Sequence, residues 1–289
     1  MTLVRSGAFA ALAAVVVASG CSKGSEAPAP ITRLVIRKVT ADLSKADPSA
    51  PYWNDVTPGI VKLTAQPMIA PRPETTTTEE VIVQAVTDGT RAAFRLRWKD
   101  PEKSEAGKLG ELSDGLALEF PLREGGELPP VFMGAKGNPV HLFHWRAQYQ
   151  RDKEKGKPTV KDIYPNVSVD MYPMEFKEAP GGTPEDREKF SPGVVEGNPQ
   201  SYAKEGVDEV IAEGFSTSAV QAGHGSTAHG EWRGGEWTLV IVRPLTIEGG
   251  SSLKSGGGAN IAFAVWQGGK GEVGARKCVT MQWTPVVIM

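Results

Sequence analysis

The sequence predicts an all-β protein, an antiparallel β-sandwich with long loop insertions. Short runs in which apolar and polar residues alternate recur along the chain, and this period of two is that of a half-buried strand. Glycine and proline are abundant, with 33 and 22 of the 289 residues, whereas runs with helical periodicity are scarce. Regularly spaced short strands that each bury one face are typical of a sandwich.

The first 20 residues are typical of a bacterial lipoprotein signal peptide. Arg5 supplies a positive start, and the apolar segment from Phe9 to Val17 is too short for a transmembrane helix. Small residues then precede Cys21. We therefore predict cleavage of residues 1–20, lipidation of Cys21 and a location on the periplasmic side, anchored to a membrane. An ordinary secretory signal is the alternative.

One domain is predicted over residues 33–289, after a small, proline-containing tether at residues 21–32. Residues 148–206 are polar and rich in proline, glycine and charge, so they are expected to form an insertion at the domain edge. With Cys21 lipidated, only Cys278 remains, and no intrachain disulfide is expected. The net charge of −2 gives no indication of nucleic-acid binding.

The predicted strands follow one another along this domain, with glycine-rich, proline-rich or charged loops between them. The clearest is 92–98, in which apolar residues alternate with Arg95 and Arg97. The segment 216–235 is glycine-rich and is expected to be a loop. Strands are predicted at 34–39, 60–65, 81–86, 92–98, 116–120, 140–147, 207–215, 236–242, 261–266 and 276–283.

The last of these predicted strands carries an unusual lysine. Lys277 lies on the same strand face as Val279, Met281 and Trp283. An ammonium group is costly to bury, and burial lowers its pKa toward the neutral amine, which can ligate a metal. The alternative is that Lys277 lies at the strand end and extends to water.

Gly269, Gly271 and Gly274 match the spacing of a dinucleotide-binding loop, G-x-G-x-x-G. That site requires a helix directly after the glycines, within a βαβ unit. Here a second strand-like run follows. We therefore predict a hairpin loop at these glycines and no nucleotide site.

Histidines are the first metal candidates that spacing alone provides. His141 and His144 are three residues apart in a predicted strand, so they point to opposite faces and cannot share one metal ion. One of them could ligate haem, or both could be surface or hydrogen-bonded histidines. His224 and His229 lie in the glycine-rich loop and give a weak signal. Met133, taken alone, is typical of a core methionine.

Four segments together carry a family resemblance. They are VFMGAKGNPVHLFHWRA (131–147), VIAEGFS (210–216), GEWTLVIVRPL (235–245) and IAFAVWQGGKGEVGARK (261–277). In combination they resemble the haem b-binding γ subunits of ethylbenzene dehydrogenase, dimethylsulfide dehydrogenase, selenate reductase and chlorate reductase, the haem subunits of the type II DMSO reductase family. The resemblance covers most of residues 33–289, with a longer 148–206 region.

The resemblance implies a haem b held without a covalent link between a methionine and a lysine. The family methionine falls on Met133 and the family lysine on Lys277, which agrees with the separate observation of a lysine on an apolar strand face. Phe132, Phe263 and Trp266 are expected to lie near the haem. Two axial ligands leave the iron no open position, so the resemblance implies an electron carrier and no catalytic activity.

The resemblance also implies partners, namely a molybdopterin catalytic subunit and an iron–sulfur subunit, or a cytochrome. The predicted lipid anchor departs from the soluble periplasmic complexes of the family. Two alternatives stay open from the residues themselves. One is a β-sandwich lipoprotein that binds carbohydrate or another ligand without haem, through exposed members of its seven tryptophans. The other is a structural lipoprotein that has lost the haem.

Overall fold

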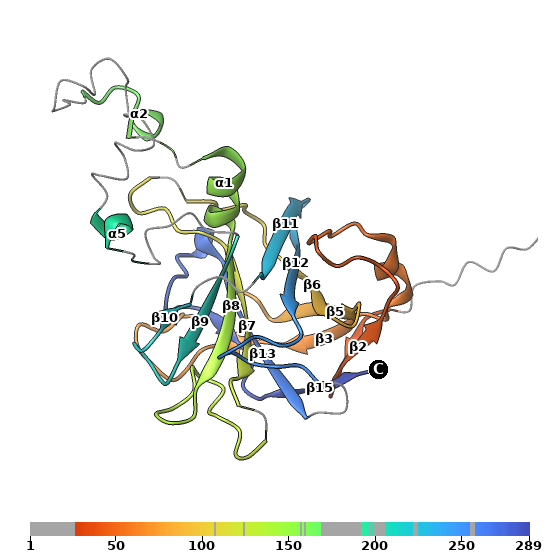
Figure 1. Cartoon of the computed structure of the whole chain (residues 1–289). Helices are drawn as coiled ribbons and strands as arrows, with labels where there is room; N and C mark the ends of the chain where they lie inside the picture. Colours follow the sequence, from red (N-terminus) through yellow and green to blue (C-terminus); the bar gives the residue numbers. More distant parts are fainter. Residues whose placement is uncertain are drawn as a thin grey trace, which may run out of the picture.

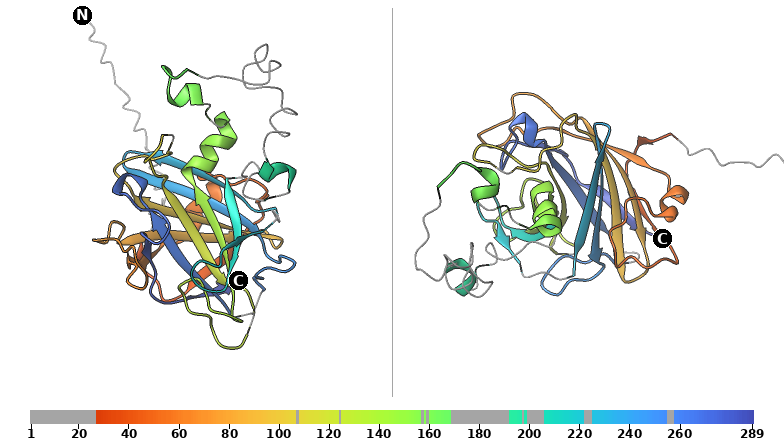
Figure 2. Two further views of the ribbon diagram at one scale, coloured as in Figure 1. Left: turned by 90° about the vertical axis from the view of Figure 1, so that its left-hand side faces the viewer. Right: turned by 90° about the horizontal axis from the view of Figure 1, so that it is seen from above.

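The computed structural model describes residues 27–289, apart from residues 107, 124, 157, 159, 169–191, 197, 199–205, 222–224 and 255–257. The predicted signal peptide, Cys21 and the first half of the tether lie outside this range. Strands dominate and form two layers (Figures 1 and 2). In the described part of the chain, no helix is long and apolar enough to cross a membrane.

The first layer has the strand order β10-β9-β8-β7-β13-β14-β4, and all neighbours in it are antiparallel. Its strands are β4 (Thr64–Ala65), β7 (Gly115–Pro121), β8 (Val140–Arg146), β9 (Val207–Ala212), β10 (Ala219–Val220), β13 (Ala259–Trp266) and β14 (Cys278–Val279). The predicted strands at 116–120, 140–147 and 261–266 form its centre.

The second layer has the order β15-β2-β5-β6-β12-β11, with β3 beside β5 and β1 beside β3. Its strands are β1 (Ala29–Pro30), β2 (Leu34–Lys38), β3 (Gly59–Lys62), β5 (Glu80–Thr87), β6 (Arg91–Lys99), β11 (Thr227–Arg233), β12 (Glu236–Pro244) and β15 (Thr284–Ile288). Strand β13 joins the layers, because its first residues pair with β15 and its last with β7.

The all-β prediction is confirmed, but the sheet is mixed and not purely antiparallel. The pairs β15–β2, β2–β5 and β1–β3 are parallel. Strands β2 and β15 come from opposite ends of the described chain and lie side by side between β5 and β13. A long connection, such as the one between these two strands, allows a parallel pair, whereas a short hairpin enforces an antiparallel one.

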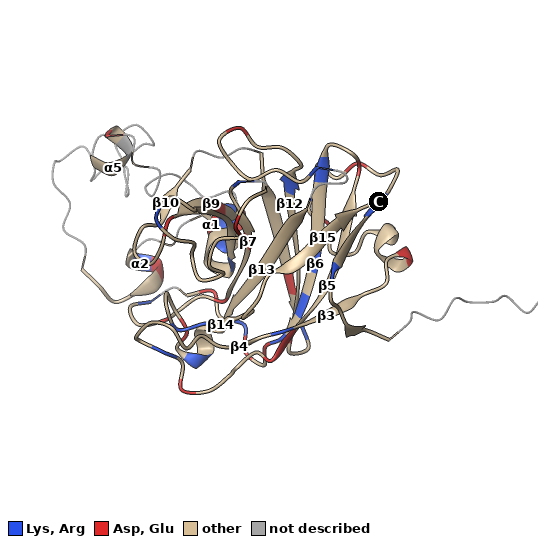
Figure 3. Ribbon diagram, turned by 90° about the horizontal axis from the view of Figure 1, so that it is seen from below, with Lys and Arg blue, Asp and Glu red and all other residues tan. Residues whose placement is uncertain are grey.

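One apolar core lies between the layers. Leu96 and Trp98 of β6 and Leu239 of β12 point into it, as their alternation predicted. Trp98, Trp145 and Trp237 meet there, with ring centroids 5.0 to 6.2 Å apart. Complete burial of one such large apolar side chain stabilises a fold by about 1.5–3 kcal/mol. The opposite face of β6 carries the alternating basic residues (Figure 3).

Two predicted segments are wrong in detail. The expected loop at 216–235 contains β10 and β11, and β11 pairs with β12 through a turn at Gly234 and Gly235, which have positive φ angles of 59° and 84°. Of the strand predicted at 276–283, only Cys278–Val279 forms, because the chain then turns from the first layer to β15 in the second. Met281 is consequently exposed.

The helices are short. They are η1 (Pro51–Asp55), α1 (Ala147–Lys155), α2 (Val160–Ile163), α5 (Pro192–Val195) and η3 (Gly268–Lys270). Helix α1 continues directly from β8 and, with α2 and α5, lies in the predicted 148–206 insertion. Much of the remainder of that segment lies outside the described residues, so its role as an insertion stays a prediction.

Candidate functional site

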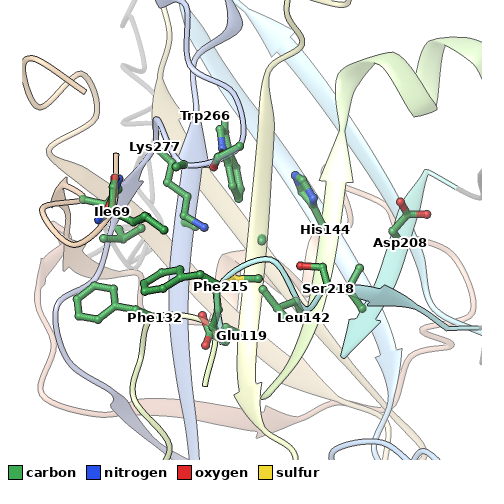
Figure 4. A pocket seen from close by; sticks show the side chains of 18 of the residues that line it. Ile69, Glu119, Phe132, Leu142, His144, Asp208, Phe215, Ser218, Trp266 and Lys277 are labelled. Carbon is green, nitrogen blue, oxygen red and sulfur yellow. Dashed lines mark hydrogen bonds between the residues drawn. The ribbon is translucent and has the colours of Figure 1, made fainter. Parts of the chain in front are cut away.

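A cavity of about 440 Å³ lies on the outer face of the first layer, on the opposite side of the sheet from the main core. Strands β7, β8, β9, β13 and β14 form its floor, and the loops at 66–70, 131–133 and 215–218 surround it (Figure 4). Its volume is within the range of about 300–1,000 Å³ that is usual for ligand and cofactor sites.

Lys277 points into this cavity (Figure 4). It directly precedes β14, in which Cys278 faces the main core, so Lys277 and Val279 face the other way. The Lys277 Nζ atom lies 4.9 Å from the centroid of the Trp266 ring. Burial lowers the pKa of Lys277, and the carboxyl group of Glu119 acts against this effect. Burial therefore shifts the protonation equilibrium of Lys277 toward the neutral amine.

Met133 lies in the loop between β7 and β8 and lines the same cavity. Its φ angle is +71°, which is unusual for a residue with a side chain. Gly134 also has a φ of +71°, and a Cβ atom there would lie 2.8 Å from the carbonyl oxygen of Asn138. Such strained backbone costs about 1–3 kcal/mol and is concentrated at functional sites. The left-handed backbone of Met133 and Gly134 therefore brings Met133 to the cavity.

Glu119 of β7 is a cavity residue that the sequence reasoning missed. Its side chain accepts a hydrogen bond from the backbone N–H of Met133. Its Oε1 atom is buried and has no hydrogen-bond partner among the described residues. Burial raises the pKa of Glu119 to about 8, while the Lys277 charge opposes the rise. Strand parity could have found it, since Leu118 and Phe120 face the core and leave Glu119 on the outside.

His144 and Trp266 form one wall of the cavity. Their rings stack with centroids 4.6 Å apart and an interplanar angle of 28°. They meet across Gly115, where a Cβ atom would lie 3.3 Å from His144 Nε2. Burial lowers the pKa of His144 well below its ordinary value, so the ring is neutral.

His141 lies on the other side of the sheet, as strand parity predicted. Its Nδ1 accepts a hydrogen bond from the backbone N–H of Ser251 at 3.1 Å, and its Nε2 lies 3.7 Å from Glu209. It therefore does not line the cavity. Of the other two histidines, His229 lies 3.5 Å from Glu154 and away from the cavity, and His224 is outside the described residues.

The aromatic residues expected from the sequence to lie near the haem are Phe132, Phe263 and Trp266. All three line the cavity. Phe132 and Trp266 belong to an apolar cluster on the cavity side, and Phe263 also packs in the main core. The glycines at 269–274 form a turn between β13 and β14, which pair with each other. The predicted hairpin is thus confirmed. In the described part of the chain, no group of three or more His, Cys, Asp or Glu residues could hold a metal ion.

The ethylbenzene dehydrogenase family model matches residues 50–278, a range that contains both Met133 and Lys277. The chain belongs to the ethylbenzene dehydrogenase family. The match includes β7, β8, β9 and β13 and the loops at 66–70, 131–133 and 215–218 that surround the cavity.

Three relatives of this family member are similar over most of the chain. It is 25% identical to the chlorate reductase γ subunit of Ideonella dechloratans, with 97% of this chain and 96% of the relative covered. It is 26% identical to a Haloferax mediterranei protein provisionally named as a respiratory nitrate reductase haem subunit, with coverage of 94% and 81%. It is 23% identical to the dimethylsulfide dehydrogenase γ subunit of Rhodovulum sulfidophilum, with coverage of 71% and 59%.

Proposed function

We propose that this chain is an exported haem b electron-transfer protein, anchored by a lipid at Cys21, and a subunit or partner of a molybdopterin oxidoreductase. The observation that carries the proposal is that Met133 and Lys277, far apart in the sequence, line one cavity. The names of the relatives, which are haem or γ subunits of reductases and a dehydrogenase, support it.

The residues present fit a haem held without a covalent link. The thioether of Met133 is a soft, neutral ligand that favours ferrous iron, and the amine of Lys277 can ligate iron only when it is deprotonated. Burial of Lys277 favours that form. When bound, the haem supplies a one-electron redox centre. Met133 and Lys277 would be the two protein ligands that hold the iron, and an iron held by two such ligands would transfer electrons and would not bind a substrate.

The other cavity residues would support these two ligands. Glu119 accepts a hydrogen bond from the backbone of Met133, and the stacked rings of Trp266 and His144 form one wall. Substrate chemistry would then take place in a partner, either a molybdopterin catalytic subunit that works with an iron–sulfur subunit or a cytochrome. The N-terminal sequence pattern supports a membrane-anchored position on the periplasmic side.

The carbohydrate-binding alternative depended on exposed tryptophans. All seven tryptophans lie within the described residues, and each is buried or half-buried. Trp53, Trp98, Trp145 and Trp237 are each at most 2% exposed. The described surface therefore offers no exposed tryptophan ring on which a sugar would stack.

The test is a visible spectrum of residues 22–289, produced in a periplasm with haem supplied, in the oxidised and dithionite-reduced states. We expect a sharp reduced α band of a six-coordinate b-type haem. Met133→Ala and Lys277→Ala should each lose or shift this band. Met281→Ala and Lys270→Ala, at exposed positions, are the matched controls and should leave it unchanged.

A colourless, folded protein that does not take up added haem would overturn the proposed function. A coloured protein whose spectrum is unchanged by both cavity substitutions would still support haem binding but would show that Met133 and Lys277 are not the ligands. His144 would then be the next residue to test.

For the anchor, the full-length chain should be found with the membrane fraction, and Cys21→Ser should release it. An unchanged distribution would contradict lipidation at Cys21.

A further inference from the structure

Large apolar side chains and the Asp208 carboxylate lie at opposite sides of the cavity (Figure 4). Ile69 and Phe132 lie at one side of it, and His144 and Asp208 lie at the other (Figure 4). Arg146, the last residue of β8, also lines the cavity. A ligand with one apolar edge and one charged edge therefore has a preferred direction of entry.

Arg146 is a half-buried cation whose hydrogen-bonding groups are available. Its guanidinium group lies 5.0 Å from the ring centroid of Tyr149 in α1. The ion pairs among the described residues do not include Arg146. The carboxylate of Asp208, which also lines the cavity, accepts a hydrogen bond from Tyr149. A partly desolvated guanidinium without an anionic partner is a binding site for a carboxylate, which it can engage with two parallel hydrogen bonds.

The strand register separates this cation from the buried acid of the cavity. Gly115 of β7 is opposite Arg146 of β8, and Glu119 is opposite Leu142. Four residues along a strand correspond to about 13 Å. A carboxylate of the ligand would thus be poorly solvated near the buried Glu119, but attracted near Arg146.

We propose that Arg146 is the carboxylate subsite of the cavity and binds a propionate of the porphyrin. The propionate edge would then lie toward β8 and α1, and the apolar edge toward Ile69 and Phe132. Asp208 disfavours a second carboxylate on its own side, so the pairing involves one propionate. This proposal rests on the proposed function, because it specifies how the same cavity orients its cofactor.

The test compares two ligands, ferric haem and its dimethyl ester, titrated into the apoprotein and followed by the Soret absorbance. The wild-type protein should bind the free diacid about ten- to a hundredfold more tightly than the ester, the range expected for one charge-assisted pair. Arg146→Gln should weaken binding of the diacid by that factor and leave the ester unchanged. Arg146→Lys should keep part of the preference for the diacid.

Arg97→Gln is the matched control, since Arg97 is a half-buried strand arginine of the second layer and lies outside the cavity. It should retain the wild-type ratio of the two affinities. Equal wild-type affinities for the two ligands would overturn the proposal, as would an Arg146→Gln variant that loses affinity for both by the same factor. Uptake of neither ligand by the wild type would instead overturn the haem function itself.

Discussion

At the scale of the residue, Lys277 and Met133 are brought to the cavity by different features of the backbone. Lys277 is presented by strand parity, which the sequence already contains, and its pKa is lowered by burial in the cavity wall. Met133 is presented by a left-handed backbone next to Gly134 and by the hydrogen bond to Glu119. Parity placed the lysine on an apolar strand face without a family resemblance, but it left open that the side chain extends to water from the strand end. The methionine was not predictable in that way, because a loop has no period.

Gly134→Ala tests the importance of the left-handed backbone at Met133 and Gly134. A Cβ atom at this position would meet the Asn138 carbonyl oxygen at 2.8 Å, in addition to the strain of a φ of +71°. Gly137→Ala is the control, because its φ is +78° but nothing lies within 4 Å of an added Cβ atom. We expect Gly137→Ala to lower the free energy of unfolding by about 1 kcal/mol and Gly134→Ala by at least about twice that. Equal losses in urea denaturation would show that the close approach is unimportant.

Glu119 can be tested by two substitutions of similar size. Glu119→Gln keeps an oxygen that accepts the N–H of Met133, whereas Glu119→Leu leaves that donor without its partner. An unsatisfied buried donor costs about 1–3 kcal/mol, so the leucine variant should be less stable than the glutamine variant by that amount. Chemical denaturation of the two apoproteins measures the difference. A leucine variant as stable as the glutamine variant would contradict the role given to this hydrogen bond.

At the scale of the element, prediction succeeded where a strand has one clean apolar face. Strands β6 and β12 alternate over most of their length, and both were located correctly. Strand β11 was missed because its run, TAHGEWR, mixes glycine and charge and is stabilised by pairing with β12. The strand predicted at 276–283 was too long because periodicity does not report where a chain must cross from one layer to another.

The connections between strands contain a pair of buried acids. Asp100 follows β6, and Asp114 precedes β7. Asp114 accepts hydrogen bonds from the backbone N–H of Ser104 at 2.7 Å, the backbone N–H of Gly268 at 2.8 Å and Trp237 Nε1 at 3.1 Å. Burial, followed by the charge of Asp114, raises the pKa of Asp100 to about 7. Together the two side chains link the loops at one end of both layers.

This pair predicts a pH dependence of stability. Because the pKa of Asp100 is higher in the folded protein than its ordinary 3.8, the folded state retains a proton that the unfolded chain releases. The associated stability is complete below about pH 4 and is lost as the pH rises through about 7. Asp100→Asn should therefore flatten the profile and raise the free energy of unfolding at pH 8 by about 1–2 kcal/mol.

Asp114→Asn is the comparison for this prediction. It places an amide where three donors converge, so it should destabilise the protein at every pH. The measurement is urea denaturation of wild type and both variants between pH 5 and pH 8. A wild-type profile that is flat over this range would show that Asp100 is ionised throughout.

At the scale of the whole molecule, the two faces of the first layer have different structural roles. One face packs against the second layer and forms the main core, while the other forms the cavity. The core supplies stability that does not depend on a ligand, so the cavity can contain groups that weaken it, namely a strained methionine, a buried carboxyl group and a lysine. The sequence predicted the central strands of this layer. It did not predict which face forms the main core and which forms the cavity, because both faces of these strands are largely apolar.

This arrangement predicts how a bound haem changes the stability of the molecule. The apoprotein should be folded, since the main core is independent of the cavity. Haem that binds only the folded state at about 100 times its dissociation constant should add about 2.7 kcal/mol to the free energy of unfolding. For a domain of this size each kcal/mol raises the Tm by about 2–4 °C. Scanning calorimetry should therefore show a clear increase for the wild type and for Lys270→Ala. Lys277→Ala at the same haem concentration should remain near the apoprotein value. An equal increase in this variant would mean that the stabilising haem binds elsewhere on the molecule.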